Sequence, residues 1–338
     1  MSHSAHYETA PEDRISFGRK IVYGLGAFVN NLLAAASGGM IIVLNLGLGM
    51  NPALVGLLGA LPRLTDALTD PLMGYISDNT TSRWGRRRPY IFIGAIAAGV
   101  IFALLWQLSR GQSETFYFVW FLVGSIVFYL AYTVFATPWV ALGYELTPDY
   151  HERTRVMAIQ NFMGQLAYLI SPWFLWIMQY EGFFDDMVSG AAGLAIAIGV
   201  AAIAIGVLPA IFLRERFRDV ALKELEAEQA PRPSQLSEIK RIVLDFFRGF
   251  IITLKFKPFM KLCLATFMVF NGFMMVAAFQ SYGIIYYVFE GDQALGAEYA
   301  GWAGTASAIG TFCVIFLVSW LSTRIGKRRA FFISTGIS

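Results

Sequence analysis

The chain has 338 residues, of which 57% are hydrophobic and only 14% are charged, whereas an ordinary soluble domain carries about 25% charged residues. A soluble fold of this composition would expose large apolar surfaces, and the small net charge of +3 argues against a nucleic-acid partner. The composition instead favours helices in a lipid bilayer, where each helix satisfies its own backbone hydrogen bonds.

Eight apolar runs are long enough to cross a bilayer, which takes about 20 helical residues. They are Ile21–Leu46, Ala53–Ser77, Tyr90–Leu108, Phe116–Tyr144, Val156–Gln179, Gly190–Leu213, Phe259–Phe289 and Tyr299–Ser322. A ninth run begins at Ala330 and stops at Ser338, which is too short to cross, so we expect further helices in the complete protein. The fold prediction is an all-α membrane protein with about eight full spans and the start of a ninth.

The basic residues between the runs predict the orientation of the helices. Connections with several Lys or Arg residues alternate with connections that have almost none, and the basic ones lie at residues 14–20, 83–88, 153–155, 214–258 and 324–329. Cytoplasmic loops are the ones enriched in Lys and Arg. The pattern therefore predicts a cytoplasmic N-terminus in a multi-pass protein of the plasma (inner) membrane.

One long hydrophilic segment, residues 214–258, divides the chain, and its part Leu236–Phe256 has the pattern of an amphipathic helix lying in the membrane interface. The sequence R-W-G-R-R-R after the second run is echoed by R-I-G-K-R-R after the eighth, which favours a parallel repeat of six-helix units. The predicted parts are a cytoplasmic N-terminus (1–20), a six-helix bundle (21–213), a cytoplasmic linker (214–258) and a partial second bundle (259–338).

The second run contains Arg63, Asp66 and Asp70, although charges inside a bilayer cost a few kcal/mol. The two acids are one helical turn apart and should share a face, with Arg63 beside them. Such a cluster suits a monovalent cation, or a proton shared because two like charges lie so close. A purely structural Arg63–Asp66 pair is the alternative, but it would leave Asp70 without a role.

Two further sets of residues are candidates. Polar and aromatic side chains inside the runs could line a solute cavity, although singly each is as well explained as contact between helices. They are Asn31, Tyr132, Trp139, Asn161, Gln165, Asn271 and Gln280. Charged residues near the cytoplasmic ends could form a gating set, in which we expect Glu145 near Arg153 and Arg155. The set comprises Arg63, Asp78, Arg86, Arg87, Arg88, Glu145, Arg153 and Arg155.

The run D-A-L-T-D-P-L-M-G-Y-I-S-D from Asp66 to Asp78, followed by R-W-G-R-R-R-P, resembles the glycoside–pentoside–hexuronide:cation symporters. This is the melibiose permease family of the major facilitator superfamily. The run A-L-G-Y-E-L-T-P-D-Y-H-E-R-T-R from Ala141 to Arg155 resembles the same family.

The resemblance implies two six-helix bundles that work by alternating access, the second of them incomplete in this chain. It also implies a coupling cation, Na⁺, Li⁺ or H⁺, on Asp66 and Asp70 with help from Thr133. The family commonly has Asn where Thr69 stands.

Three positions depart from the melibiose pattern. Asn31, Ala136 and a position at or near Asn161 stand where melibiose permease has charged residues for its sugar. We therefore expect a cation-coupled symporter of another glycoside or sugar, with a non-sugar solute such as a lysolipid as the alternative. The expected partners are that solute, the cation and the bilayer. We expect no other cofactor, no nucleic acid and a monomer.

Two other classes remain open. A membrane prenyltransferase would need two acidic motifs on separate helices, and only one such motif is found, so we do not expect an enzyme. The sequence alone does not exclude a channel or a sensor that transports nothing.

Overall fold

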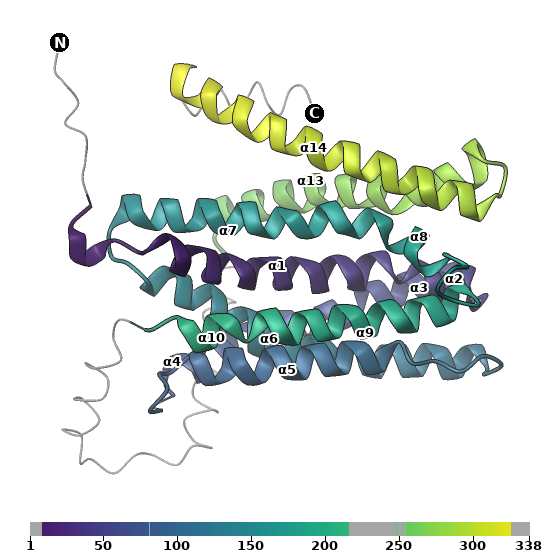
Figure 1. The fold of residues 1–338 in the computed structure, drawn as a ribbon, viewed down its shortest axis with the longest axis horizontal. Coiled ribbons are helices and arrows are strands. Elements are labelled where there is room, and N and C mark those ends of the chain that lie inside the picture. Colours follow the sequence, from purple (N-terminus) through teal and green to yellow (C-terminus); the bar gives the residue numbers. More distant parts are fainter. Residues whose placement is uncertain (1–8, 81, 216–247, 249–251, 253–254, 326–338) are drawn as a thin grey trace.

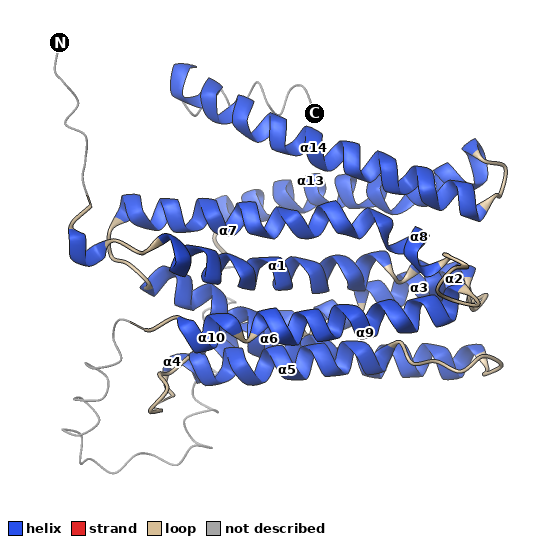
Figure 2. Ribbon diagram, viewed as in Figure 1, coloured by secondary structure: helices blue, strands red, loops and turns tan. Residues whose placement is uncertain are grey.

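The computed structural model describes residues 9–80, 82–215, 248, 252 and 255–325. Throughout these residues every regular element is a helix (Figure 2). The predicted amphipathic helix Leu236–Phe256 falls mostly outside the described residues, and the ninth apolar run falls wholly outside them.

Each of the eight predicted runs corresponds to a described helix or chain of helices. In order they are α1 (Phe17–Gly39) with α2 (Ile42–Leu46); α3 (Pro52–Ala60), η2 (Pro62–Leu64) and α4 (Asp66–Asp78); α5 (Arg88–Leu105); α6 (Glu114–Glu145); α7 (Tyr150–Ile170), η3 (Ser171–Trp173) and α8 (Phe174–Met178); α9 (Met187–Gly206) with α10 (Leu208–Phe212); α13 (Lys257–Tyr282) with the π-helical turn η4 (Gly283–Val288); and α14 (Gln293–Ile325). A short 3₁₀ turn, η1 (Pro11–Asp13), precedes them.

By length and composition alone, four described stretches can cross a membrane: Pro11–Leu46, Arg88–Leu105, Glu114–Glu145 and Met187–Phe212. The second predicted run does not qualify as one helix because it is interrupted. Pro62 lacks the N–H that would continue α3, and the chain passes through the 3₁₀ turn η2 before α4 starts at Asp66. The interruption separates Arg63 from the acids that follow it.

Helix α5 packs against α6 and α9 in the first bundle. Small residues allow these contacts. A Cβ placed on Gly94 would lie 2.4 Å from the backbone nitrogen of Phe135, and one on Gly99 would lie 2.6 Å from the carbonyl oxygen of Gly199. Close backbone approach through small residues is a typical way for membrane helices to associate. Large side chains such as Phe102 and Phe128 fill the core around these crossings.

Helices α13 and α14 begin the second bundle. Helix α14 contacts η3, α8 and α7, and its C-terminal part diverges from α7 (Figure 1). The Trp173 Nε1 donates a hydrogen bond to the Thr305 hydroxyl of α14, with a distance of 2.8 Å. The two groups of helices therefore touch near η3 and separate toward the end where α1 begins.

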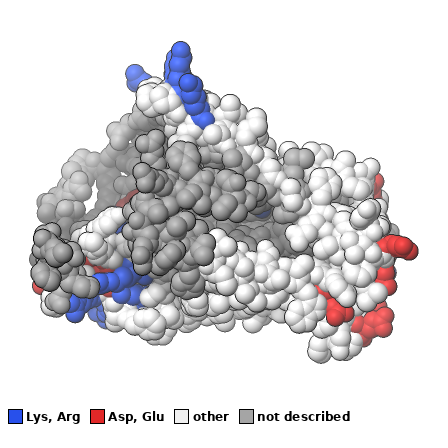
Figure 3. Space-filling view, turned by 90° about the horizontal axis from the view of Figure 1, so that it is seen from above, with Lys and Arg blue, Asp and Glu red and all other residues white. Residues whose placement is uncertain are grey.

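Charge is unequal between the two ends of the molecule. Figure 3 shows Asp and Glu side chains at the end where α2 and α8 lie, and Lys and Arg side chains at the opposite end. This distribution agrees with the alternation of basic and non-basic connections in the sequence.

Candidate functional site

Asp66 and Asp70 lie in the first turns of α4, and Asp70 faces α6. Its Oδ1 accepts hydrogen bonds from the hydroxyls of Thr133 at 2.8 Å and Thr137 at 3.2 Å. Within the described part of the chain, the buried Oδ1 of Asp66 and the buried Oγ1 of Thr69 have no hydrogen-bond partner. Unpartnered oxygen acceptors next to two carboxylates suit a hard monovalent cation or a proton. The structure brings together the four residues expected to bind the cation, Asp66, Thr69, Asp70 and Thr133, and their role in cation binding stays a prediction.

Thr137 was not among the predicted residues. It lies one turn after Thr133 on α6, so the i, i+4 spacing of the two hydroxyls was the signal that could have found it. Among the described residues no group of three or more His, Cys, Asp or Glu side chains is placed to hold a metal ion. The binding of a transported ion by the oxygens beside Asp66 and Asp70 stays a prediction.

Arg63 does not form the structural pair with Asp66 that was one alternative. No ion pair within 4.0 Å joins the two residues in the part of the chain that the structure describes, and Arg63 instead lines a separate small pocket. It also lies far along the second run from Asp78 and the other charges with which it was grouped.

Four of the predicted gating residues do come together at the end of α4, α5 and α6. Arg87 donates to Asp78 Oδ1 from Nε at 2.9 Å and from Nη2 at 2.5 Å, and its Nη1 lies 3.0 Å from Glu145 Oε2. Arg86 also pairs with Glu145. Because three different helices share these charges, they tie the ends of α4, α5 and α6 together. Their role in gating stays a prediction.

Glu215, which follows α10, completes this end of the bundle and was not predicted. Its carboxylate is buried and accepts from the backbone N–H groups of Arg86, Arg87 and Arg88 at 2.8, 2.8 and 3.1 Å. The side chain of Arg88 donates to the carbonyl oxygens of Ala210 and Ile211, at 2.5 and 2.9 Å. Arg88 therefore links α5 to α10 through its side chain.

The expected grouping of Glu145 with Arg153 and Arg155 is wrong. Arg153 donates to the carbonyl oxygen of Thr147 at 3.2 Å, and Arg155 pairs with Glu152 at 2.9 Å. Glu145 pairs instead with Arg86 and Arg87, and the two arginines lie in the first turns of α7, which begins at Tyr150.

Glu152, which was not predicted either, organises this second cluster. It is 2% exposed and accepts from Lys20 Nζ at 2.6 Å, from the Ile15 backbone at 3.0 Å and from Arg155. Burial acts to raise the Glu152 pKa, but the hydrogen bonds from Lys20, Ile15 and Arg155 outweigh it and lower the pKa. Together with the Thr9–Asp149 hydrogen bond of 3.2 Å, Glu152 holds the N-terminal segment (residues 9–15) against the start of α7.

The structure does not gather the seven predicted solute residues into one cavity. Trp139 is a core residue: it is 2% exposed, stacks on Tyr23 at 5.2 Å and donates from Nε1 to the Tyr23 carbonyl oxygen at 3.2 Å. Tyr132 donates to Asn30 Oδ1 at 2.8 Å, and the Asn30 amide donates to Asn31 Oδ1 at 3.2 Å, so both predicted residues join a contact between α1 and α6.

The remaining members lie on the helices of the two groups. Asn271 is exposed and donates to the Phe267 carbonyl oxygen of its own helix at 2.8 Å. Asn161 and Gln165 lie on α7, where Asn161 is exposed. Gln280 alone among the seven lines the large pocket that the described residues form.

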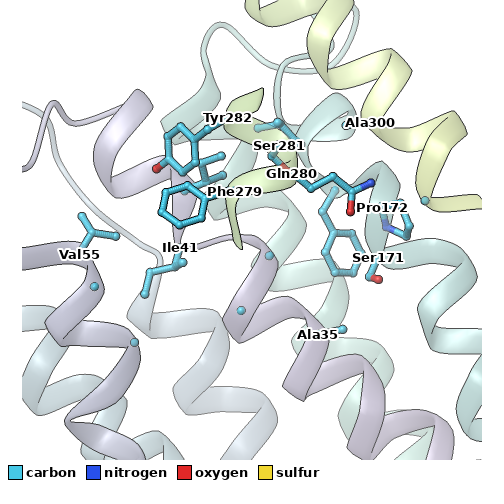
Figure 4. Close-up of a pocket in the computed structure, with 18 of the residues that line it drawn as sticks. Ala35, Ile41, Val55, Ser171, Pro172, Phe279, Gln280, Ser281, Tyr282 and Ala300 are labelled. Carbon is cyan, nitrogen blue, oxygen red and sulfur yellow. The ribbon is translucent and has the colours of Figure 1, made fainter. Parts of the chain in front are cut away.

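That large pocket has a volume of about 970 Å³ and lies between α1, α3, η3, α13 and α14. Figure 4 shows Phe279, Gln280, Ser281 and Tyr282 of α13 near it, together with Ile41 and Val55 of the first bundle and Ser171 and Pro172 of η3. Its walls are mainly aliphatic, aromatic and glycine residues, with few polar groups. A cavity of this size is within the range of small-molecule sites.

The fold and this site define a class: a multi-pass integral membrane protein that carries an acid pair on one helix and a cavity between helices. Residues 22–338 match the family described as MFS/sugar transport protein, and the chain belongs to that family. This confirms the predicted family and fold class.

The chain is 28% identical to a Synechocystis protein named Uncharacterized symporter sll1374 over 62% of this chain and 40% of that one. It is 28% identical to the isoprimeverose transporter of Lactiplantibacillus pentosus over 68% of this chain and 48% of that one. The matches span less than half of these relatives' length. A crystal structure of a D-xylose-proton symporter shares the fold, with a TM-score of 0.59 and 17% identity over 90% of this chain and 69% of that one.

Proposed function

We propose that the protein is a cation-coupled symporter of a glycoside or another sugar. The arrangement around Asp70 carries the proposal: a carboxylate inside a membrane helix accepts two threonine hydroxyls, and Asp66 beside it keeps a buried oxygen without a partner. Ionisable groups within membrane helices mark ion and substrate pathways. Similarity to an isoprimeverose transporter supports a sugar solute over a lysolipid, and family membership supports a transporter over a membrane enzyme.

The mechanism we infer is alternating access with Na⁺, Li⁺ or H⁺ as the coupling ion. The cation binds first between Asp66 and Asp70, where Thr133 and Thr137 supply further oxygens. Its charge neutralises the acids and orders α4 against α6, which raises the affinity for the solute by a coupling free energy of about 1–3 kcal/mol in typical cases. The Asp78, Arg86, Arg87 and Glu145 cluster would then close or release the cytoplasmic ends of α4, α5 and α6.

The proposed setting is the plasma membrane, with the N-terminus in the cytoplasm and one chain as the working unit. The end of the molecule that carries Lys and Arg would face the cytoplasm, in accord with the bias of cytoplasmic loops toward positive charge (Figure 3). The acidic end would then face outward.

The test is uptake by the protein as its gene encodes it, reconstituted into vesicles. Radiolabelled glycosides and lysolipids are screened with a Na⁺ gradient, with a pH gradient and with neither. Asp70→Asn is compared with Asp185→Asn, a matched change at an exposed residue of the α8–α9 connection. We expect sugar uptake that requires one gradient, is lost in Asp70→Asn and persists in Asp185→Asn.

Uptake that persists in Asp70→Asn with unchanged ion dependence would refute the assignment of the cation site. Gradient-driven uptake of lysolipids, with none of sugars, would refute the assignment of the solute.

A further inference from the structure

One hydrogen bond joins the two groups of helices at the acidic end of the molecule, where α2 and α8 lie. Trp173 of η3 donates its Nε1–H to the Thr305 hydroxyl of α14, with a distance of 2.8 Å. That hydroxyl donates its own hydrogen to the Gly301 carbonyl oxygen of α14 at 2.9 Å, so it accepts from Trp173 through a lone pair. The bond therefore crosses from the first bundle to the second and satisfies both polar groups.

Close packing surrounds this hydrogen bond. A Cβ on Gly301 would lie 2.9 Å from the Trp173 ring, so only a small residue allows the ring to approach α14 this closely. A Cβ on Gly304 would lie 2.4 Å from the Cβ of Pro172. The Trp302 ring forms a T-shaped pair with Trp173, with 5.1 Å between the centroids. We call this interface the Trp173 contact, and its residues are Pro172, Trp173, Gly301, Trp302, Gly304 and Thr305.

The contact is confined to one end of the interface between the two groups of helices. Pro172 lacks the N–H that would continue α7, so the chain turns through η3 there and meets α14. Gly301 is buried at this level, whereas Ile309 and Val314, further along α14, are each 54% exposed. The two groups are therefore held together at the acidic end and diverge toward the other end (Figure 1).

The Trp173 contact also forms part of the wall of the large pocket. Pro172 and Gly304 line that pocket, together with the neighbouring residues Ser171 and Ala300 (Figure 4). Alternating access requires one group of helices to rock against the other around the solute site. A contact between the groups at one end must then break when that end opens, so separation of Trp173 from α14 would open the pocket toward the acidic end.

We propose that Trp173 is a positioning residue that holds the acidic end of the solute pathway shut. Its hydrogen bond to Thr305 sets the fraction of molecules that are open at that end, because a bond made in only one of two states shifts their equilibrium by its own free energy. The inference rests on the alternating access of the proposed function and goes beyond it. It requires neither a particular solute nor a particular coupling ion.

The test is the rate at which a membrane-impermeant maleimide labels single cysteines of the full-length protein in membrane vesicles of known sidedness. Cys263 and Cys313 are first replaced by serine. Glu298→Cys, at an exposed residue of α14, then shows which face of the membrane the acidic end occupies. The reporters are Ala35→Cys in the first bundle and Ser281→Cys in the second, which line the large pocket and lie outside the Trp173 contact (Figure 4).

Two conservative variants break the hydrogen bond from either side, and each has a matched control. Trp173→Phe removes the N–H and keeps an aromatic ring, while Thr305→Val removes the acceptor and keeps the shape. Trp120→Phe is the control for the first, because the Trp120 Nε1 donates to a backbone carbonyl within the first bundle at 2.9 Å. Thr311→Val is the control for the second, because the Thr311 hydroxyl donates to a backbone carbonyl of its own helix at 2.9 Å.

With the maleimide on the face of the acidic end, both reporters should be labelled about fivefold faster in Trp173→Phe and in Thr305→Val, as expected when an equilibrium loses one hydrogen bond. The double variant should match either single variant, because both changes remove the same bond. Labelling from the opposite face should not increase. Trp120→Phe and Thr311→Val should be labelled at the wild-type rate.

Unchanged labelling in both variants would overturn the inference. Faster labelling of one reporter alone, or of both reporters from both faces, would indicate loosened packing and would overturn it as well. The same holds for additive effects in the double variant, or for an equal increase in the controls. Labelling needs no solute and no ion gradient, so this experiment can succeed when the Asp70→Asn uptake experiment fails, and the reverse also holds.

Discussion

Removing the carboxylate of Glu215 should loosen the start of α5. Glu215 accepts three backbone N–H groups, from Arg86, Arg87 and Arg88 at 2.8–3.1 Å, and is only 7% exposed. The first N–H groups of a helix have no partner within the helix, and the helix dipole favours negative charge there. Loss of an ordinary capping side chain costs about 1 kcal/mol, and hydrogen bonds to a charged acceptor are worth more.

We expect Glu215→Ala to lower the free energy of local opening at residues 86–88 by about 2 kcal/mol. Hydrogen exchange of these three amides should then be roughly 30-fold faster, since about 1.4 kcal/mol corresponds to a factor of ten. Glu215→Gln keeps one carbonyl acceptor but loses the charge, so its effect should be smaller.

The assay is hydrogen exchange with mass spectrometry of the protein in detergent or nanodiscs. Glu181→Ala serves as the control because Glu181 is exposed in the connection between α8 and α9. Unchanged exchange at residues 86–88 in Glu215→Ala, with the fold intact, would show that water replaces the carboxylate at no cost. The reasoning about the cap would then be refuted.

Three further predictions follow. Thr133→Val removes one hydrogen bond to Asp70, which is worth about 1 kcal/mol. The cation concentration that gives half-maximal uptake should therefore rise about fivefold. An unchanged concentration would contradict the proposed role of Thr133 in the cation site. The Glu152 pKa lies below its usual 4.5, so its stabilisation of the N-terminal segment is complete above that pH and is lost as the pH falls through the lowered pKa. Proteolysis of this segment should accelerate on acidification, and a Glu152→Gln variant should be cut readily at neutral pH; equal cutting of wild type and variant at pH 7 would disprove this role. Gly99→Ala places a Cβ 2.6 Å from the Gly199 carbonyl oxygen, and this overpacking should lower the free energy of unfolding by about 1–3 kcal/mol. Gly18→Ala is the control, because its Cβ would meet nothing within 4 Å and thermal stability should not change.

The helices were predictable because the bilayer imposes a length and an apolar composition on every span. All eight runs reappear as helices or chains of helices, and Asp66 and Asp70 were found because charges are rare in such runs. The break at Pro62 was not predicted, because hydropathy does not register a proline inside an otherwise apolar run. Local sequence thus located the spans better than it located interruptions within them.

The partners of the charged residues were less predictable. Glu215 is separated from Arg86 by 129 positions, and Glu152 reaches Ile15 across 137, so only tertiary packing reveals either contact. Trp139 was assigned to a cavity because it is aromatic, but its N–H finds a backbone carbonyl in the core, which satisfies it without a ligand. Residue type predicted which groups need partners but not where those partners are.

The cap on α5 also has a consequence for the order of assembly during synthesis. The backbone groups of Arg86 are made 129 residues before the carboxylate that receives them. At translation rates of about 5–20 residues per second, roughly 6–26 seconds pass between the two. During that interval the start of α5 is without its cap. The third span therefore inserts before its first turn is capped, and the sixth span must be synthesised before the Glu215 carboxylate can complete the cap.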